Sequence, residues 1–187
     1  MSLTDSEFTA LRATIASRGT VRMVLVPVTL IGWASLAIVV VLVGDLPVAA
    51  LPPLAVLVGG FEAINALHVG VERIGRYLQV FHEGPGTGAA WETTAMAASP
   101  RLPGTGVDPL FTVVFAAASI LNMTTALVPE PTPIETLIIG GLHAAFLIRL
   151  ARARQVASAQ RARDLQAFQD ARAALARTAD THVVSGE

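Results

Sequence analysis

One stretch of the sequence carries most of the side chains that could do chemistry. Its carboxylate, imidazole, guanidinium and amide groups recur every three or four residues, which places them on one face of a helix. The members of this polar stripe are Glu62, Asn65, His68, Glu72, Arg76, Gln79 and Glu83. Such a face could line a path for protons or cations. It could equally be a hydrated surface with salt bridges, because Glu four residues before Arg is the favourable order on a helix.

The first member of the stripe lies inside a long apolar segment. Counting 1.5 Å per residue from Pro52 places Glu62 about 15 Å deep in a bilayer, where an ionisable group is costly and normally has a partner. His143 lies at the same estimated depth when the count starts from Pro133, and a Gly-Gly pair closely precedes each residue. We therefore expect a pair between Glu62 and His143. It could lock two helices together or exchange a proton near neutral pH.

Motifs for catalysis, metals and cofactors are weak. There is no cysteine, which removes disulfides and thiolate ligands. His68, His143, Glu62 and Glu72 could form a carboxylate and histidine site, but the Glu-x-x-His pairs of di-iron bundles are absent. The two histidines also differ by about 9 Å in estimated depth, which disfavours a bis-histidine haem. No hydrolase, phosphate-loop or metalloprotease motif occurs. We predict no catalytic residues, no metal and no cofactor, and favour a non-enzymatic protein.

Four apolar blocks must position these residues. Hydrophobic residues make up 53% of the chain and charged residues only 14%. The blocks lie at about 23–43, 48–71, 109–128 and 133–150, each close to the roughly 20 residues that cross a bilayer as a helix. The sequence therefore predicts an all-α integral membrane protein, with a four-transmembrane-helix bundle within residues 21–150.

The distribution of arginine predicts the orientation of the bundle. All 13 basic residues are arginines, and in the four-span arrangement every one falls on the same side. The two opposite loops, around Asp45 and Glu130, contain none. Because positive residues are enriched on the cytoplasmic side, both termini are expected in the cytoplasm, as in a multi-pass protein of a bacterial-type inner membrane.

Outside the spans we expect further helices. Residues 1–20 have an amphipathic pattern, which predicts a short interfacial helix that ends at Gly19. The second helix should continue beyond the bilayer to Glu83, followed by an irregular cytoplasmic loop at 84–107. Residues 151–180 lack proline and glycine, so the fourth helix should extend into the cytoplasm, with a disordered tail at 181–187.

One helix start has a specific signature. Thr132 and Glu135 have the spacing of a capping box, in which each side chain accepts a hydrogen bond from the backbone amide of the other residue. The fourth span is therefore expected to begin at Pro133, the first helical position, where proline is favoured.

Two classes of function fit these features. The first is a scaffold or accessory subunit that acts through helix–helix contacts in the membrane and through cytoplasmic helices. The second is a small homo-oligomeric channel, or a proton- or cation-coupled transporter, with the polar stripe lining the path. In either class the partners are the lipid bilayer and other protein chains, in a homo-oligomer or a larger membrane complex, and no nucleic acid.

Overall fold

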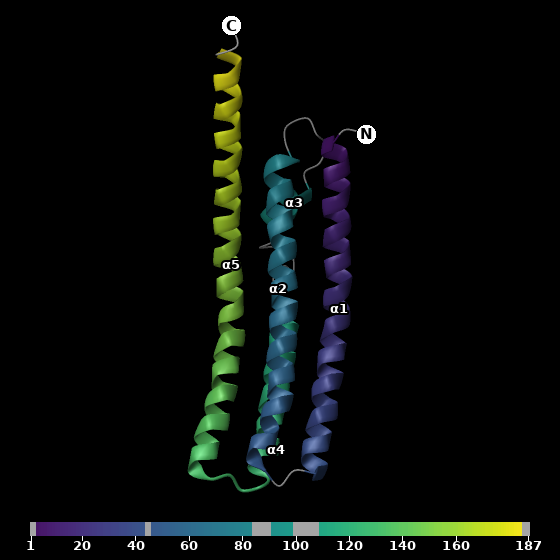
Figure 1. The fold of residues 1–187 in the computed structure, drawn as a ribbon, viewed down its shortest axis with the longest axis vertical. Coiled ribbons are helices and arrows are strands. Elements are labelled where there is room, and N and C mark those ends of the chain that lie inside the picture. Colours follow the sequence, from purple (N-terminus) through teal and green to yellow (C-terminus); the bar gives the residue numbers. More distant parts are fainter. Residues whose placement is uncertain (1–2, 44–45, 84–90, 99–108, 185–187) are drawn as a thin grey trace. The chain divides into compact units, whose positions relative to one another are not determined.

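The computed structural model describes residues 3–43, 46–83, 91–98 and 109–184, and these residues are almost entirely helical (Figure 1). The elements follow in the order α1 (Leu3–Val43), the 3₁₀ helix η1 (Pro47–Ala50), α2 (Leu51–Phe81), α3 (Trp91–Ala98), α4 (Pro109–Leu127) and α5 (Pro133–Val184). There is no strand in these four ranges. The predicted all-α class is confirmed.

Three of the helices are long and apolar enough to cross a membrane. The qualifying segments are Asp5–Leu42, Pro47–Phe81 and Pro133–Ala153. The fourth predicted span corresponds to α4, whose apolar part, Phe111–Leu127, is shorter. The structure is therefore that of a helical protein whose apolar helices suggest a membrane location.

The predicted end of the first helix at Gly19 is wrong. Helix α1 runs without a break through Gly19, from the amphipathic segment into the first apolar block. A glycine inside a helix costs only about 1 kcal/mol relative to alanine, less than the backbone hydrogen bonds that a break would forfeit. The interfacial helix and the first span are thus one element.

Two other expectations about irregular segments need correction. The predicted loop at 84–107 contains α3, an eight-residue helix, and its other residues lie outside the described ranges. Helix α5 includes residues 181–184 of the predicted tail, whereas 185–187 lie outside the described ranges. Helix α5 runs from Pro133 to Val184 without a break, and the cytoplasmic location of its part beyond residue 150 stays a prediction.

The capping box at the start of α5 is confirmed. The Thr132 amide and hydroxyl both donate to Glu135 Oε2, at 2.9 and 2.7 Å, and the Glu135 amide lies 3.4 Å from Thr132 Oγ1. These contacts satisfy backbone donors that the first turn of a helix leaves without an intrahelical partner.

The chain forms two compact units, which we call the polar unit and the apolar unit. The polar unit comprises Met1–Ser17, Val69–Thr105 and Val156–Glu187, and the apolar unit comprises Arg18–His68 and Gly106–Gln155. Helices α1, α2 and α5 each contribute residues to both units.

The core of the apolar unit is built around aromatic contacts between three helices. Phe61 of α2 packs edge-on against Phe115 of α4 and Phe146 of α5, with ring centroids 5.6 and 6.0 Å apart. The outward sides of this unit are also apolar: Ile31 and Leu137 are 66% and 74% exposed. A helix that is hydrophobic on all sides is typical of a buried or membrane-spanning position.

Helices α1 and α2 approach closely at one glycine of the apolar unit. A Cβ atom on Gly60 would overlap the side chain of Thr29 and lie 2.8 Å from its Cβ, which no rotamer change can move. A Cβ atom on the neighbouring Gly59 would meet nothing within 4 Å. Gly60 is therefore needed for the backbone distance, and Gly59 is not.

We predict that Gly60→Ala destabilises the protein by about 1–3 kcal/mol, because the added methyl group must push two helices apart. Gly59→Ala is the matched control and should be neutral or stabilising, by up to about 1 kcal/mol, since alanine is the better helix former. Thermal unfolding of both variants in detergent tests this expectation. Equal midpoints for the two variants would contradict the close approach.

Candidate functional site

The two units divide the predicted polar stripe between them. The apolar unit contains Glu62, Asn65 and His68, and the polar unit contains Glu72, Arg76, Gln79 and Glu83. Each part therefore has its own surroundings.

The expected pair between Glu62 and His143 is not formed. Glu62 accepts a hydrogen bond from Arg149 Nη2 at 2.8 Å, and the Arg149 guanidinium lies 5.7 Å from the Phe61 ring centre. His143 is buried and has other partners: its Nδ1 lies 2.8 Å from the Ile139 carbonyl and its Nε2 lies 3.1 Å from Asn122 Nδ2. Since a carbonyl can only accept, Nδ1 carries the proton and Nε2 accepts from the Asn122 amide.

The reason for the different pairing is the register of α2 and α5. The Asn122 amide that contacts His143 also donates to the carbonyl of Ala50, at 2.9 Å. His143 therefore lies nearer the start of α2 than Glu62 does, and Phe61, next to Glu62, packs against Phe146, three residues farther along α5. Arg149, about 9 Å beyond His143 along α5, has a side chain long enough to reach Glu62. The sequence-based estimate assumed that Pro52 and Pro133 lie at the same depth in the membrane. The Asn122 contacts contradict that assumption.

Asn122 is a central polar residue that the site prediction did not include. It is fully buried, and its Oδ1 also accepts a hydrogen bond from Trp33 Nε1 at 3.2 Å. Through one side chain it contacts α1, η1 and α5. Its position as an amide within an otherwise apolar block could have identified Asn122 from the sequence, because such groups hold membrane helices together by hydrogen bonds.

His68 and Asn65 complete the part of the stripe in the apolar unit. The Nη1 group of Arg22 in α1 lies 3.0 Å from His68 Nδ1, and the Arg22 guanidinium lies 6.0 Å from the ring centre of Phe111. Because a guanidinium only donates, His68 Nδ1 is the acceptor. Asn65 is half-buried.

In the polar unit the carboxylates of the stripe and of α5 join helices through ion pairs. Arg161 of α5 binds Glu72 of α2 with two parallel hydrogen bonds, the two-point geometry that favours arginine over lysine. About one turn farther along α5, Asp164 Oδ2 lies 3.1 Å from Nε of Arg73, the residue after Glu72. Gln160 donates to the other oxygen of Asp164 at 2.9 Å. These contacts fix the α2 and α5 segments of the unit to each other.

Among the described residues of the unit, Arg76 is the most deeply buried charge, with 4% of its surface exposed. Its Nη1 donates to Gln79 Oε1 at 2.9 Å, and its Nη2 lies 3.6 Å from Glu92 of α3. Glu92 also accepts from Arg12 of α1 at 3.1 Å, so it lies between two guanidinium groups. Gly75 makes room for this carboxylate, because a Cβ atom there would lie 2.8 Å from Glu92 Oε2.

Glu83, the last residue of the stripe, caps the start of α3. Its carboxylate accepts from the backbone amides of Glu92 and Thr93, at 2.6 and 2.8 Å, and from the Thr93 hydroxyl at 2.7 Å. Burial raises the pKa of Glu83, but the hydrogen bonds from Thr93 and Glu92 and the charge of Arg12 outweigh it. The pKa therefore lies below its ordinary value of 4.5.

The first turns of α1 join the same unit through Glu7 and Phe8. Glu7 accepts a hydrogen bond from the Tyr77 hydroxyl at 2.8 Å and lies 3.7 Å from His82 Nε2. The Phe8 ring packs on the His82 ring, and Tyr77 packs edge-on against Phe168 of α5. Segments that are distant in the sequence are thus fastened to the last turns of α2.

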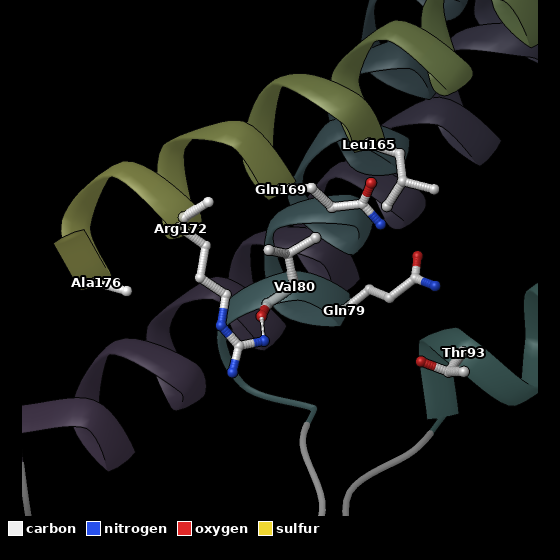
Figure 2. Close-up of a pocket in the computed structure, with 8 residues that line it drawn as sticks. Gln79, Val80, Thr93, Leu165, Gln169, Arg172 and Ala176 are labelled. Carbon is white, nitrogen blue, oxygen red and sulfur yellow. Dashed lines mark hydrogen bonds between the residues drawn. The ribbon is translucent and has the colours of Figure 1, made fainter.

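A hollow of about 460 Å³ lies beside these turns (Figure 2). Arg172 of α5 reaches the end of α2, where its Nη1 donates to the Val80 carbonyl at 2.6 Å. Figure 2 shows the carboxamides of Gln79 and Gln169 and the hydroxyl of Thr93 around one space. The residues that line the hollow are Gln79, Val80, Thr93, Leu165, Gln169, Arg172, Ala173 and Ala176.

Within the described ranges, no group of three or more histidine and acidic side chains is gathered as a metal ion would require. Comparison with known proteins gives no further guide: no family model, curated protein or solved structure matches the chain. The candidate site is therefore defined by geometry alone, as the ion-pair network of the polar unit and its hollow.

We predict that Glu83→Gln destabilises the docking of α3 by about 1 kcal/mol, because a neutral amide caps helix donors less well than a carboxylate. The capping contribution of Glu83 is fully present above pH 4.5, the ordinary pKa, and is lost as the pH falls through its lower folded pKa. NMR shifts of the α3 amides should report this change. Asp170→Asn, at an exposed carboxylate of α5, is the control. Unchanged α3 signals in Glu83→Gln would refute the cap.

Proposed function

We propose that this chain is a polytopic inner-membrane protein of non-enzymatic type, a scaffold or accessory subunit that assembles with other proteins through its helices. The apolar surface of its helices supports the membrane location. Ile31, Ile38 and Leu137, for example, are 66%, 60% and 74% exposed. Large contiguous apolar surfaces are rare on soluble monomers, whereas lipid solvates them well.

We further propose that all four apolar helices span the bilayer. Helix α4 has 19 residues and a length of about 28 Å, close to the roughly 30 Å of the hydrocarbon layer. The arginine distribution supports cytoplasmic termini. In this topology the segments of the polar unit belong to the cytoplasmic side, where they are available to other proteins.

The engagement of the polar stripe is the observation that favours a scaffold over a channel. Glu72 is held by Arg161, Glu83 by the amides of α3, and Arg76 by Gln79 and Glu92. In the apolar unit Glu62 is held by Arg149. A conducting path would need such groups to face water, whereas here they hold helix segments together. A rigid helical platform is what a docking subunit requires.

The topology predicts the labelling of single cysteines, which the chain allows because it has none of its own. Cysteine at the exposed Glu130 should react with a membrane-impermeant maleimide added to intact cells. Cysteine at the exposed Arg163 should react only after the membrane is permeabilised. The reverse pattern, or equal labelling of both, would overturn the proposed orientation.

Assembly tests the function. Extracted in mild detergent, the full chain should have the mass of a complex with a different protein, measured by native mass spectrometry. A closed homo-oligomer that conducts cations in liposomes would instead establish the channel alternative. Glu62→Gln serves as the discriminating variant: complex formation should persist in a scaffold, whereas flux should fall in a channel that uses the stripe.

A further inference from the structure

Most arginines that join the helices of the polar unit bind a carboxylate, whereas Arg172 binds a backbone carbonyl. Arg73 binds Asp164 and Arg161 binds Glu72. Arg12 and Arg76 share the carboxylate of Glu92. Arg172 contacts a backbone carbonyl and no carboxylate among the described residues. Its positive charge lies beside the hollow and is not neutralised there.

The contact with Val80 fixes the Arg172 side chain. Val80 is one residue from the end of α2, where carbonyl groups lack an intrahelical donor, so the guanidinium acts as a cap. One Nη1–H is used in this bond. A guanidinium has five N–H donors in a planar fork, so donors remain for a ligand in the hollow.

The other polar groups of the hollow add to its donor character. Arg76 donates to Gln79 Oε1, which leaves the NH₂ group of Gln79 as the free end of that carboxamide. Gln169 brings a second carboxamide from α5 (Figure 2). The Thr93 hydroxyl donates a hydrogen bond to Glu83, so the Thr93 oxygen can still accept one, for instance from a peptide N–H. None of the eight lining residues is acidic.

The other residues that line the hollow have apolar side chains. Val80 and Leu165 form aliphatic surface, and Ala173 and Ala176 leave space above α5. A ligand that matches this lining carries a carboxylate on a short aliphatic stem, next to peptide groups that can meet Thr93 and Gln169. An acidic amino-acid side chain within a polypeptide has this chemistry.

We propose that the hollow is a docking site for an acidic side chain of a partner protein, with Arg172 as the residue that recognises the carboxylate. This inference rests on the proposed scaffold function and names the chemistry of its contact. The carboxylate pairs with the guanidinium, the NH₂ group of Gln79 adds a hydrogen bond, and the stem packs against Val80 and Leu165.

Blocked glutamate, N-acetylglutamate N-methylamide, is the probe, titrated into the full ¹⁵N-labelled chain in detergent and followed at the Arg172 Nε–H signal by NMR. We expect a saturable shift. The glutamine counterpart of the probe should bind about tenfold more weakly or worse, because a hydrogen bond to a charged group is lost. Equal binding of the two probes would refute carboxylate recognition.

Matched variants locate the site. Arg172→Gln should lower the affinity at least about tenfold, whereas Arg163→Gln, at an exposed arginine that does not line the hollow, should leave it unchanged. Should Arg172→Gln unfold, Ala173→Leu fills the hollow and keeps the charge, with Ala171→Leu as its control. For these variants the Ala176 methyl signal replaces the Arg172 signal. Binding that survives both Arg172→Gln and Ala173→Leu would overturn the proposal.

A third probe distinguishes the kind of ligand. If free succinate binds more tightly than blocked glutamate, the ligand of the hollow is a small metabolite and the proposed occupant is refuted. If the chain purifies with a protein partner but does not bind blocked glutamate, only this inference is refuted. A chain that binds blocked glutamate but purifies without a partner refutes the scaffold function instead.

Discussion

The polar unit depends on the pairing of one buried guanidinium group. Arg76 is almost fully removed from solvent, and an unpaired charge there would cost several kcal/mol. Its charge is opposed by the Glu92 carboxylate of α3, and it donates a hydrogen bond to Gln79 on its own helix. Glu92 also binds Arg12 of α1. Glu83 then holds α3 in place through its backbone amides. Residues distant in the sequence are thus ordered around a single side chain.

The apolar unit meets the same constraint with uncharged groups. Asn122 has no exposure, and its amide has partners on Trp33, Ala50 and His143. In an apolar medium each of these groups would be costly to leave without a hydrogen bond. The resulting network specifies how the helices pair, which aromatic packing alone would specify less sharply. His143 is one member of this network, with both ring nitrogens in use, and this explains why it is not available to Glu62.

The sequence predicted what depends on local composition and missed what depends on the register between helices. Apolar block lengths predicted the helices, and the Thr132–Glu135 spacing predicted a cap that the structure confirms. The partner of Glu62 could not be predicted in this way, because an arginine side chain reaches across more than one turn. Arg172 lies outside the stripe, and its role emerges only where α5 meets the end of α2. The helix end predicted at Gly19 is wrong because a single glycine does not end a helix when the residues on both sides of it favour helix.

The energetics of the stripe argue against a conducting role for most of it. Opening a path along Glu72 or Arg76 would require breaking partly or fully buried ion pairs, which costs about 3–5 kcal/mol for a buried pair when one partner is left behind. The Glu62–Arg149 pair is different, because both side chains are more than one-third exposed, at 43% and 37%. Even there the two charges cancel, so a passing cation would meet a dipole and not a carboxylate. A selective cation site needs unbalanced negative charge, whereas the unbalanced group beside the hollow of the polar unit is the cation of Arg172. The electrostatics therefore favour binding of acidic groups over conduction of cations.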